Sequence, residues 1–185
     1  MQLVESKSNK FFYHYYPNIV TVVAARFENK INLMPVAWNS GVSSNPRYFA
    51  VMIAKKRYTY ELIKKSQKFS ANFLSWDYLK LVDDIGSVSG REVDKISKFN
   101  IPVQEGKNDG IVILPISYAV YECKVVKDEE IGDHNLIIGE VLTVHINPDV
   151  FDENERPILN KVSPIFYFGK NRYVKLTPSE EVEFD

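Results

Sequence analysis

Short runs of β-branched and aromatic residues fill most of the sequence, and they constrain the fold more than any other feature. Such residues favour strands, and a run that soon ends at a turn is typical of a strand rather than a helix. Closing a sheet on itself removes exposed strand edges, so many short strands with few helices predict a mainly β fold, a β-barrel decorated by short helices. The predicted strands cover residues 19–27, 31–38, 48–54, 68–74, 111–126, 136–146, 164–169 and 172–176.

The first two runs form a predicted hairpin with its turn at residues 28–30. Pro35 lies inside the second arm, and proline removes one donor from a strand ladder, so this arm is expected at a sheet edge or at a bulge. The polar residues from Asn39 to Pro46 predict a loop between the second and third strands.

Three segments instead show helical spacing. Residues 58–66 place apolar side chains on one side of a short helix. Ser75 is a candidate cap for a second helix that runs through residue 85, and Ser89–Glu92 matches a capping box in front of a third helix over residues 92–99.

No repeat, low-complexity tract or linker interrupts residues 10–176. A chain of 185 residues therefore predicts one domain over residues 1–185, with a core at 10–176. The acidic ending at 177–185 is expected to be a loose tail.

The composition excludes several function classes. Lys and Arg number 23 and Asp and Glu number 24, so no net charge draws the chain to nucleic acid or to anionic lipid. Cys123 is the only cysteine, which excludes an internal disulfide. The first residues lack a signal-peptide pattern, and no apolar run approaches the ~20 residues of a membrane helix. We therefore expect a cytoplasmic protein without a membrane partner.

Metal and hydrolytic chemistry find little support. His14, His134 and His145 lie in separate segments without ligand spacing, so no metal site is predicted. The chain contains no GxSxG elbow, although a triad dispersed along the sequence stays open. The glycine-rich phosphate loops GxGxxG and GxxxxGKS are also absent.

A different kind of anion site is indicated after the third strand. Lys55, Lys56 and Arg57 are followed at once by Tyr58 and Thr59 and by a predicted helix start. Basic side chains, a hydroxyl and helix N-terminal amides together suit a phosphate group. A solvated basic turn is the alternative, and composition alone favours it.

Two further segments suit a flat ligand. Trp38 and the small polar residues up to Pro46 offer an indole beside backbone donors and acceptors, and a polar turn fits the same residues. The small-residue strand Phe69–Asn72 allows a ligand to approach the backbone, and simple strand packing is its alternative reading.

Taken in order, the segments resemble the flavin reductase-like family, most closely its flavoredoxin-type members, which fold as an FMN-binding split barrel. The resemblance covers nearly the whole chain after the first dozen residues. The segments that carry it are NLMPVAWNSGVSSNP (32–46), KKRYTYELI (55–63), FSANFL (69–74), SGREVDKI (89–96), YECKV (121–125), GDHNLIIGEV (132–141) and PIFYFGKNRYVKL (164–176).

The resemblance implies where a flavin is held. In the family, the loop after the second strand holds the isoalloxazine ring, and the segment after the third strand holds the phosphate and the ribityl chain. Ala71 replaces the valine that is usual in the family's F-x-V-N strand. The cofactor-binding residues implied in this way are Trp38, Asn39, Ser40, Lys55, Arg57, Tyr58, Thr59, Asn72 and Lys95.

The same resemblance gives His134 a catalytic role. In related reductases the histidine of G-D-H lies beside the flavin and helps to seat the nicotinamide. Gly132 supplies backbone freedom and Asp133 a hydrogen bond or a charge at the same rim. A polar residue that only caps a strand is the alternative for His134.

The expected function is that of a flavin reductase that binds FMN and passes a hydride from NADH or NADPH to it. FAD is the alternative flavin, because family members differ. The resemblance also implies a homodimer and an oxygenase or another redox partner. Two alternatives stay open: an FMN electron carrier reduced by a protein partner, and a non-enzymatic β-barrel binding module.

Overall fold

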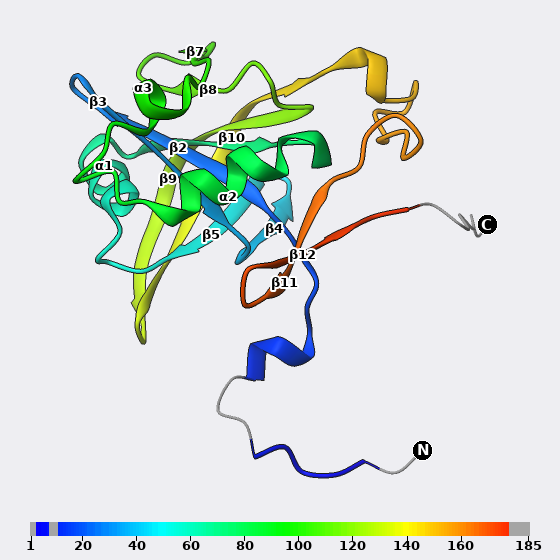
Figure 1. The fold of residues 1–185 in the computed structure, drawn as a ribbon. Coiled ribbons are helices and arrows are strands. Elements are labelled where there is room, and N and C mark those ends of the chain that lie inside the picture. Colours follow the sequence, from blue (N-terminus) through cyan, green and yellow to red (C-terminus); the bar gives the residue numbers. More distant parts are fainter. Residues whose placement is uncertain (1–2, 8–10, 178–185) are drawn as a thin grey trace.

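The computed structural model describes residues 3–7 and 11–177, and more of these residues lie in strands than in helices (Figure 1). Seven antiparallel strands form the main sheet in the spatial order β3-β2-β6-β9-β10-β5-β4. Their bounds are β2 Thr21–Phe27, β3 Lys30–Val36, β4 Asn39–Ser44, β5 Arg47–Ile53, β6 Lys68–Phe73, β9 Ala119–Ile131 and β10 His134–Ile146. The mainly β prediction is confirmed.

Two smaller sheets accompany the main one. The first has the order β1-β11-β12 and joins a segment near the start of the chain to the last two strands. The second pairs β7 with β8. Their bounds are β1 Asn18–Ile19, β11 Ile165–Gly169, β12 Arg172–Lys175, β7 Gln104–Glu105 and β8 Val112–Ile113.

The main sheet curls because its two edge strands are consecutive in the chain. Only Ala37 and Trp38 separate β3 from β4, although these strands lie at opposite ends of the sheet order. The carbonyl of Trp38 accepts a hydrogen bond from the amide of Met52 (2.9 Å), which ties this link to β5. The prediction that Pro35 lies on an edge strand is confirmed by the place of β3.

Strand β2 is covered on both faces, because it lies between two apolar cores. Val23 and Ala25 belong to the core inside the barrel. Val22 and Ala24 face an outer core that includes Ile85 of helix α2. A strand covered on both faces reads as a continuous apolar run, as residues 19–27 do.

The helices close the barrel and cover its outside. Helix α1 contributes Leu62 and Ile63 to the barrel core, whereas Val82 and Ile85 of α2 pack on the outer face of the sheet. Figure 1 shows α2 lying across the strands. The bounds are α1 Tyr58–Ser66, α2 Leu79–Ser87 and α3 Lys95–Phe99, with 3-10 turns η1 Phe11–His14, η2 Trp76–Tyr78 and η3 Pro148–Val150.

The loop predicted for residues 39–46 is wrong in its first part. Asn39–Ser44 form the edge strand β4, which pairs with β5 and has a bulge between Gly41 and Ser43. Serine and glycine rarely favour strands, but backbone pairing with a buried neighbour decides the conformation here.

The capping box at Ser89 is also wrong. Its hydroxyl accepts from the amide of Arg91 in a turn (3.3 Å), and the third helix begins only at Lys95. Asp94 caps that helix by accepting from the amides of Ile96 and Ser97. The second helix begins as the turn η2, and the side chain of Ser75 makes no capping bond.

The single strand predicted for residues 111–126 is two strands. β8 ends at Ile113, and a turn closed by the amide of Ser117 and the carbonyl of Leu114 precedes β9. β9 then continues to Ile131, because its polar end pairs with β10 in a long hairpin. All but the first residue of the predicted acidic tail lies outside the described residues.

Candidate functional site

Two cavities that share a wall form the candidate site. One, of about 540 Å³, is lined by several aromatic side chains and is here called the aromatic cavity. The other, of about 460 Å³, is lined by Arg57 and Lys95 and is here called the basic cavity. They share Met34, Pro35, Arg57, Gly86 and Ser87, so they form one continuous cleft.

The aromatic cavity has a flat wall built around Trp38. The indole ring lies 4.8 Å from the imidazole ring of His134, at an interplanar angle of 41°. Its Nε1 donates to the hydroxyl of Tyr16 (3.2 Å), and Tyr167 packs edge-on against Tyr16. Planar apolar walls with a few polar groups suit a flat heterocycle.

His134 reaches this cavity because it opens strand β10 directly after a tight turn. Gly132 in that turn has a φ of +63°, which glycine adopts without steric cost. Nδ1 of His134 lies 2.7 Å from Oδ1 of Asp133, and this bond lowers the pKa of the Asp133 carboxyl. A proton on Nδ1 fits the contact and leaves Nε2 as an acceptor in the neutral ring.

The basic cavity gathers donors from several elements, and one acidic residue, Glu92, also lines it. Arg57 precedes helix α1, whose first residues Tyr58 and Thr59 line the cavity. Lys95 is 5% exposed, and its Nζ donates to the carbonyls of Leu33 (2.8 Å) and Ile85 (2.7 Å). An ammonium group has three donors, so one is left for a ligand.

The charge of this cavity favours an anion. Burial, and then the nearby charge of Arg57, lower the pKa of Lys95 to about 8. Within residues 3–7 and 11–177, neither cation has a carboxylate within 4.0 Å. A phosphate group at this point would relieve the repulsion between the two cations.

Close packing shapes the floor of the basic cavity. The Oγ1 of Thr59 accepts from Nδ2 of the buried Asn32 (2.8 Å). A Cβ atom on Gly90 would lie 2.0 Å from Oδ1 of Asn32, so only glycine fits there. The hydrogen bond from Asn32 of β3 therefore fixes the position of the Thr59 side chain in the wall of the basic cavity.

Six of the predicted site residues line this cleft. The structure brings together Trp38, His134, Arg57, Tyr58 and Thr59, and Lys95 joins them from α3. Arg57 and His134 line the same cavity, although 76 positions separate them in the sequence. The roles of these residues in holding a ligand stay predictions.

Three other predicted residues lie elsewhere. Lys55 forms an ion pair with Glu130 on the surface and lines neither cavity. Asn39 donates to the carbonyls of Ile19 and Val36 (both 2.9 Å), so it stabilises the link between β3 and β4. The exposed Ser40 donates to the carbonyl of Gly41. Direct contacts from these side chains to a ligand in the cleft are not supported by this geometry.

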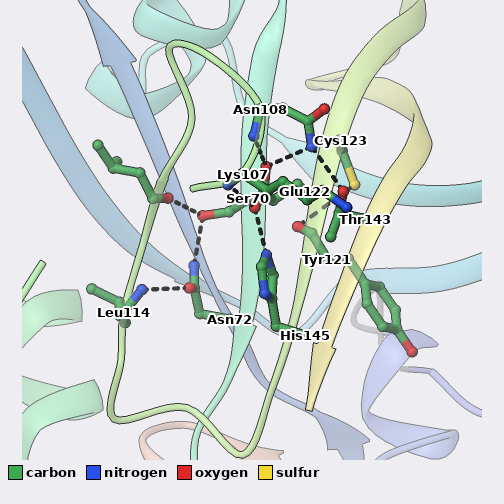
Figure 2. Close-up of polar contacts among 11 residues, drawn as sticks. Ser70, Asn72, Lys107, Asn108, Leu114, Tyr121, Glu122, Cys123, Thr143 and His145 are labelled. Atoms are coloured by element: carbon green, nitrogen blue, oxygen red, sulfur yellow. Dashed lines mark hydrogen bonds and ion pairs between the residues drawn. The ribbon is translucent and has the colours of Figure 1, made fainter. Parts of the chain in front are cut away.

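Asn72, predicted as a cofactor ligand, is a core residue whose side chain lines neither cavity. It is fully buried, and its Nδ2 donates to the carbonyl of Val22 and to the hydroxyl of Ser70. Its Oδ1 accepts from the amide of Leu114, as Figure 2 shows. Its hydrogen-bonding atoms are thus engaged within the protein, away from the cleft.

Figure 2 also shows a second polar network on the outer face of the sheet. The carboxylate of Glu122 is fully buried and accepts from the amides of Lys107 (2.7 Å) and Asn108 (2.8 Å). Nδ2 of Asn108 (2.7 Å) and Nε2 of His145 (2.5 Å) complete its contacts. This network fastens the segment around β7 and β8 to β9 and β10.

Several cleft residues are not singled out by the sequence patterns. Tyr16, Tyr167 and Tyr173 come from opposite ends of the chain and meet through the small sheet β1-β11-β12. Tyr167 and Tyr173 lie in the segment 164–176 that carries the family resemblance, but apart from the high aromatic content nothing in the sequence marks these tyrosines as cleft residues. Gly86 and Gly90 lie where small residues cluster, a pattern that signals close backbone approach rather than a helix cap.

Comparison with known proteins decides the family. A model of the flavin reductase like domain matches residues 12–176. The chain belongs to the flavin reductase-like family. Membership of this family supports a flavin-related redox function, and the residues of the cleft fit a flavin nucleotide: a flat aromatic wall lies beside two cations for a phosphate.

Two solved structures resemble this flavin reductase-like chain closely. The FMN-binding protein of Thermus thermophilus, with bound 1-cyclohex-2-enone, is 36% identical, with a TM-score of 0.87, 99% of this chain covered and 100% of that one. Flavoredoxin from Methanosarcina acetivorans is 27% identical, with a TM-score of 0.86, 98% of this chain covered and 95% of that one. The split-barrel prediction is confirmed.

A curated relative adds a named activity. The reductase component of the FADH(2)-dependent resorcinol hydroxylase of a Rhizobium species is 26% identical over 147 residues, which cover 78% of this chain and 76% of that protein.

Among the described residues of the flavin reductase-like chain, no helix has the length and apolarity to cross a membrane.

Proposed function

We propose that this chain binds FMN and transfers a hydride to it from NADH or NADPH. One observation carries the proposal: the cavity lined by the rings of Trp38 and His134 is continuous with a cavity where Arg57 and Lys95 have no carboxylate within 4.0 Å among the described residues. A ring with a phosphate tail matches both halves. The FMN-binding protein of Thermus thermophilus supports FMN over FAD as the ligand.

The residues of the chain have distinct tasks in this proposal. Arg57, Lys95 and the first amides of α1 hold the phosphate through charge and hydrogen bonds. Trp38 restricts the position of the ring, and His134 orients the nicotinamide through Nε2. The bound flavin supplies the two-electron acceptor, while the protein supplies proximity and exclusion of water.

The first experiment is the spectrum of the purified protein, followed by an anaerobic reaction. Protein loaded with FMN is mixed with NADH or with NADPH, and the absorbance near the flavin maximum is followed in a stopped-flow instrument. Rapid bleaching by one dinucleotide is expected. A protein that leaves the fluorescence of added FMN unchanged would contradict the proposal at its first step.

An electron carrier is the second candidate, because flavoredoxin from Methanosarcina acetivorans shares the fold at 27% identity. The same FMN-loaded protein separates the two functions. Bleaching by reduced ferredoxin, with no response to either dinucleotide, would establish the carrier. His134 at the wall of an open cavity favours the reductase, because a carrier has no need to seat a nicotinamide.

Partners follow from the same function. A reductase delivers its reduced flavin or its electrons to an acceptor, and the relative from Rhizobium is the reductase component of a hydroxylase. We propose an oxygenase or another redox protein as the acceptor and a homodimer as the assembly. Light scattering coupled to size-exclusion chromatography measures the mass in solution, and a monomer of 21.4 kDa would rule out the dimer.

A further inference from the structure

Three polar side chains from three elements meet between helix α1 and the β9–β10 hairpin. The hydroxyl of Tyr60 donates to Oδ2 of Asp128 (3.0 Å) and accepts from Nδ2 of Asn135 (3.0 Å). The same Nδ2 donates to Oδ1 of Asp128 (2.6 Å). These residues, here called the Tyr60 cluster, line neither the aromatic nor the basic cavity.

The cluster holds a defined geometry. Tyr60 is 7% exposed and Asn135 is 4% exposed, whereas Asp128 is exposed, and a hydrogen bond to a carboxylate is stronger than one between neutral groups. Burial, and then the bond to Asp128, raise the pKa of Tyr60 to about 12, so the phenol keeps its proton at neutral pH and the donor direction is fixed. The buried Oδ1 of Asn135 has no hydrogen-bond partner in the described part of the chain. Leaving such an acceptor unpaired is unfavourable, so packing must hold this side chain in place.

Two of the three members are next to residues of the cleft in the sequence. Tyr60 lies in the first turn of α1, directly after Tyr58 and Thr59, which line the basic cavity. Asn135 directly follows His134, which lines the aromatic cavity. The cluster therefore joins the two elements that carry opposite ends of the cleft.

The other connections at this place are weaker. The ion pair of Lys55 with Glu130 has both side chains more than half exposed, and surface pairs of this kind contribute little. Strand β5 pairs with β10 and is linked to α1 by the turn at residues 54–57. Lys55, Lys56 and Arg57 in this turn are exposed, so the turn is not held in place by burial. Within the described part of the chain, the Tyr60 cluster supplies the side-chain hydrogen bonds between α1 and β10.

We propose that Tyr60 is a positioning residue that couples the phosphate end of the cleft to His134. Through Asp128 and Asn135 it fixes the first turn of α1 against the start of β10, so that the phosphate contact and the ring face keep one arrangement. The inference rests on the proposed function, since it assigns Tyr60 a part in the same flavin site.

The test is a double-mutant cycle on FMN affinity, measured by quenching of flavin fluorescence. Tyr60→Phe removes one hydroxyl and keeps the ring that packs in the barrel core. We expect the dissociation constant of FMN to rise about fivefold, the size of one moderate hydrogen bond. Arg57→Ala should then weaken binding by a factor at least about three times smaller in the Tyr60→Phe protein than in the wild type.

Tyr118→Phe is the matched control. Tyr118 is a second buried tyrosine of the barrel core, 9% exposed, and it lines neither cavity of the cleft. Its loss of a hydroxyl should leave FMN affinity within about twofold and leave the effect of Arg57→Ala unchanged. If Tyr60→Phe does not fold, Asp128→Asn, which keeps the side-chain shape and removes the charge, takes its place in the cycle.

A second cycle examines the other end of the cleft. Tyr60→Phe and His134→Ala are combined, and the rate constant of flavin reduction by the dinucleotide is measured at saturating FMN. Coupling requires that the combined loss be smaller than the product of the single losses. If the wild type binds FMN but the effects of the two mutations simply multiply in both cycles, the inference about Tyr60 is overturned. If the wild type binds no FMN, the proposed function itself is overturned.

Discussion

Arg57 is an exposed cation at the junction of the two cavities, and a ligand phosphate is its proposed partner. Replacing Arg57 with alanine should weaken FMN binding about tenfold, the lower end for a charged hydrogen bond because the side chain is exposed. A fluorescence titration measures the change. Lys55→Ala removes an equal charge two residues earlier, outside the cleft, and should leave the affinity unchanged. If both variants lose the same FMN affinity, the loss reflects the overall positive charge near the site and not a direct contact of Arg57 with the phosphate.

Lys95 gives FMN binding a pH dependence. Burial lowers its pKa from 10.5 to about 8, so the empty site loses the ammonium charge as the pH rises through about 8. A phosphate binds the protonated form better, so FMN affinity should be constant below that pH and fall above it. Titrations from pH 6.5 to 10 measure the slope. Lys95→Met should flatten it, whereas Lys98→Met, an exposed lysine of the same helix, should not.

At the scale of elements, the contact of the turn at Gly90 with strand β3 is the tightest approach around the basic cavity. A methyl group at Gly90 would lie 2.0 Å from Oδ1 of Asn32, so Gly90→Ala must displace Asn32 and break its bond to Thr59. We expect FMN affinity to fall about tenfold and the unfolding free energy by about 2 kcal/mol. Urea unfolding and FMN titration measure the two effects. Gly41→Ala on β4, where a Cβ meets nothing within 4 Å, is the neutral control.

The elements also show what a sequence can predict. Strands β2 and β5 are predictable because each is a short continuous run of β-branched, aromatic or other apolar residues, and helix α1 is predictable because its apolar residues repeat at helical spacing. Strand β4 has no such pattern, since only its backbone pairs with β5. Asn72 shows the same limit at the site. The sequence around an asparagine in a strand does not reveal whether its side chain bonds to a ligand or, as here, to the backbone amide of Leu114. The resemblance brought Trp38, Arg57 and His134 together, but the tyrosines of the small sheet depend on contacts between the chain ends.

At the scale of the whole molecule, Glu122 is the residue on which global stability should depend most. Its four hydrogen bonds hold the segment around β7 and β8 to the sheet (Figure 2). Glu122→Gln replaces an acceptor oxygen with a donor and should lower the unfolding free energy by about 3 kcal/mol. Urea unfolding at pH 7 measures the loss. Glu129→Gln, on an exposed part of the same strand, should cost little.

At acidic pH, the difference in unfolding free energy between the wild type and Glu122→Gln should become smaller. Burial raises the pKa of Glu122, but the hydrogen bonds from His145, Asn108 and Lys107 outweigh it, so the pKa lies below the ordinary value of 4.5. The stabilisation is complete above about pH 4.5 and is lost as the pH falls through the native pKa. The wild type and Glu122→Gln should therefore converge in urea midpoint between pH 5 and pH 3. A constant gap would mean that the carboxylate charge is not responsible.

The two-residue link of Ala37 and Trp38 has a consequence for how relatives of this chain can differ in length. An insertion of one residue there would turn every following side chain of β4 to the opposite face and move the indole away from the imidazole. The turn at Gly132 is the tip of the β9–β10 hairpin, where an added Cβ would meet nothing within 4 Å, so extra residues there meet no packed neighbour, although the φ of +63° favours glycine at this position. Among relatives, insertions and deletions should accumulate around the turn at Gly132 and be missing from the link between β3 and β4.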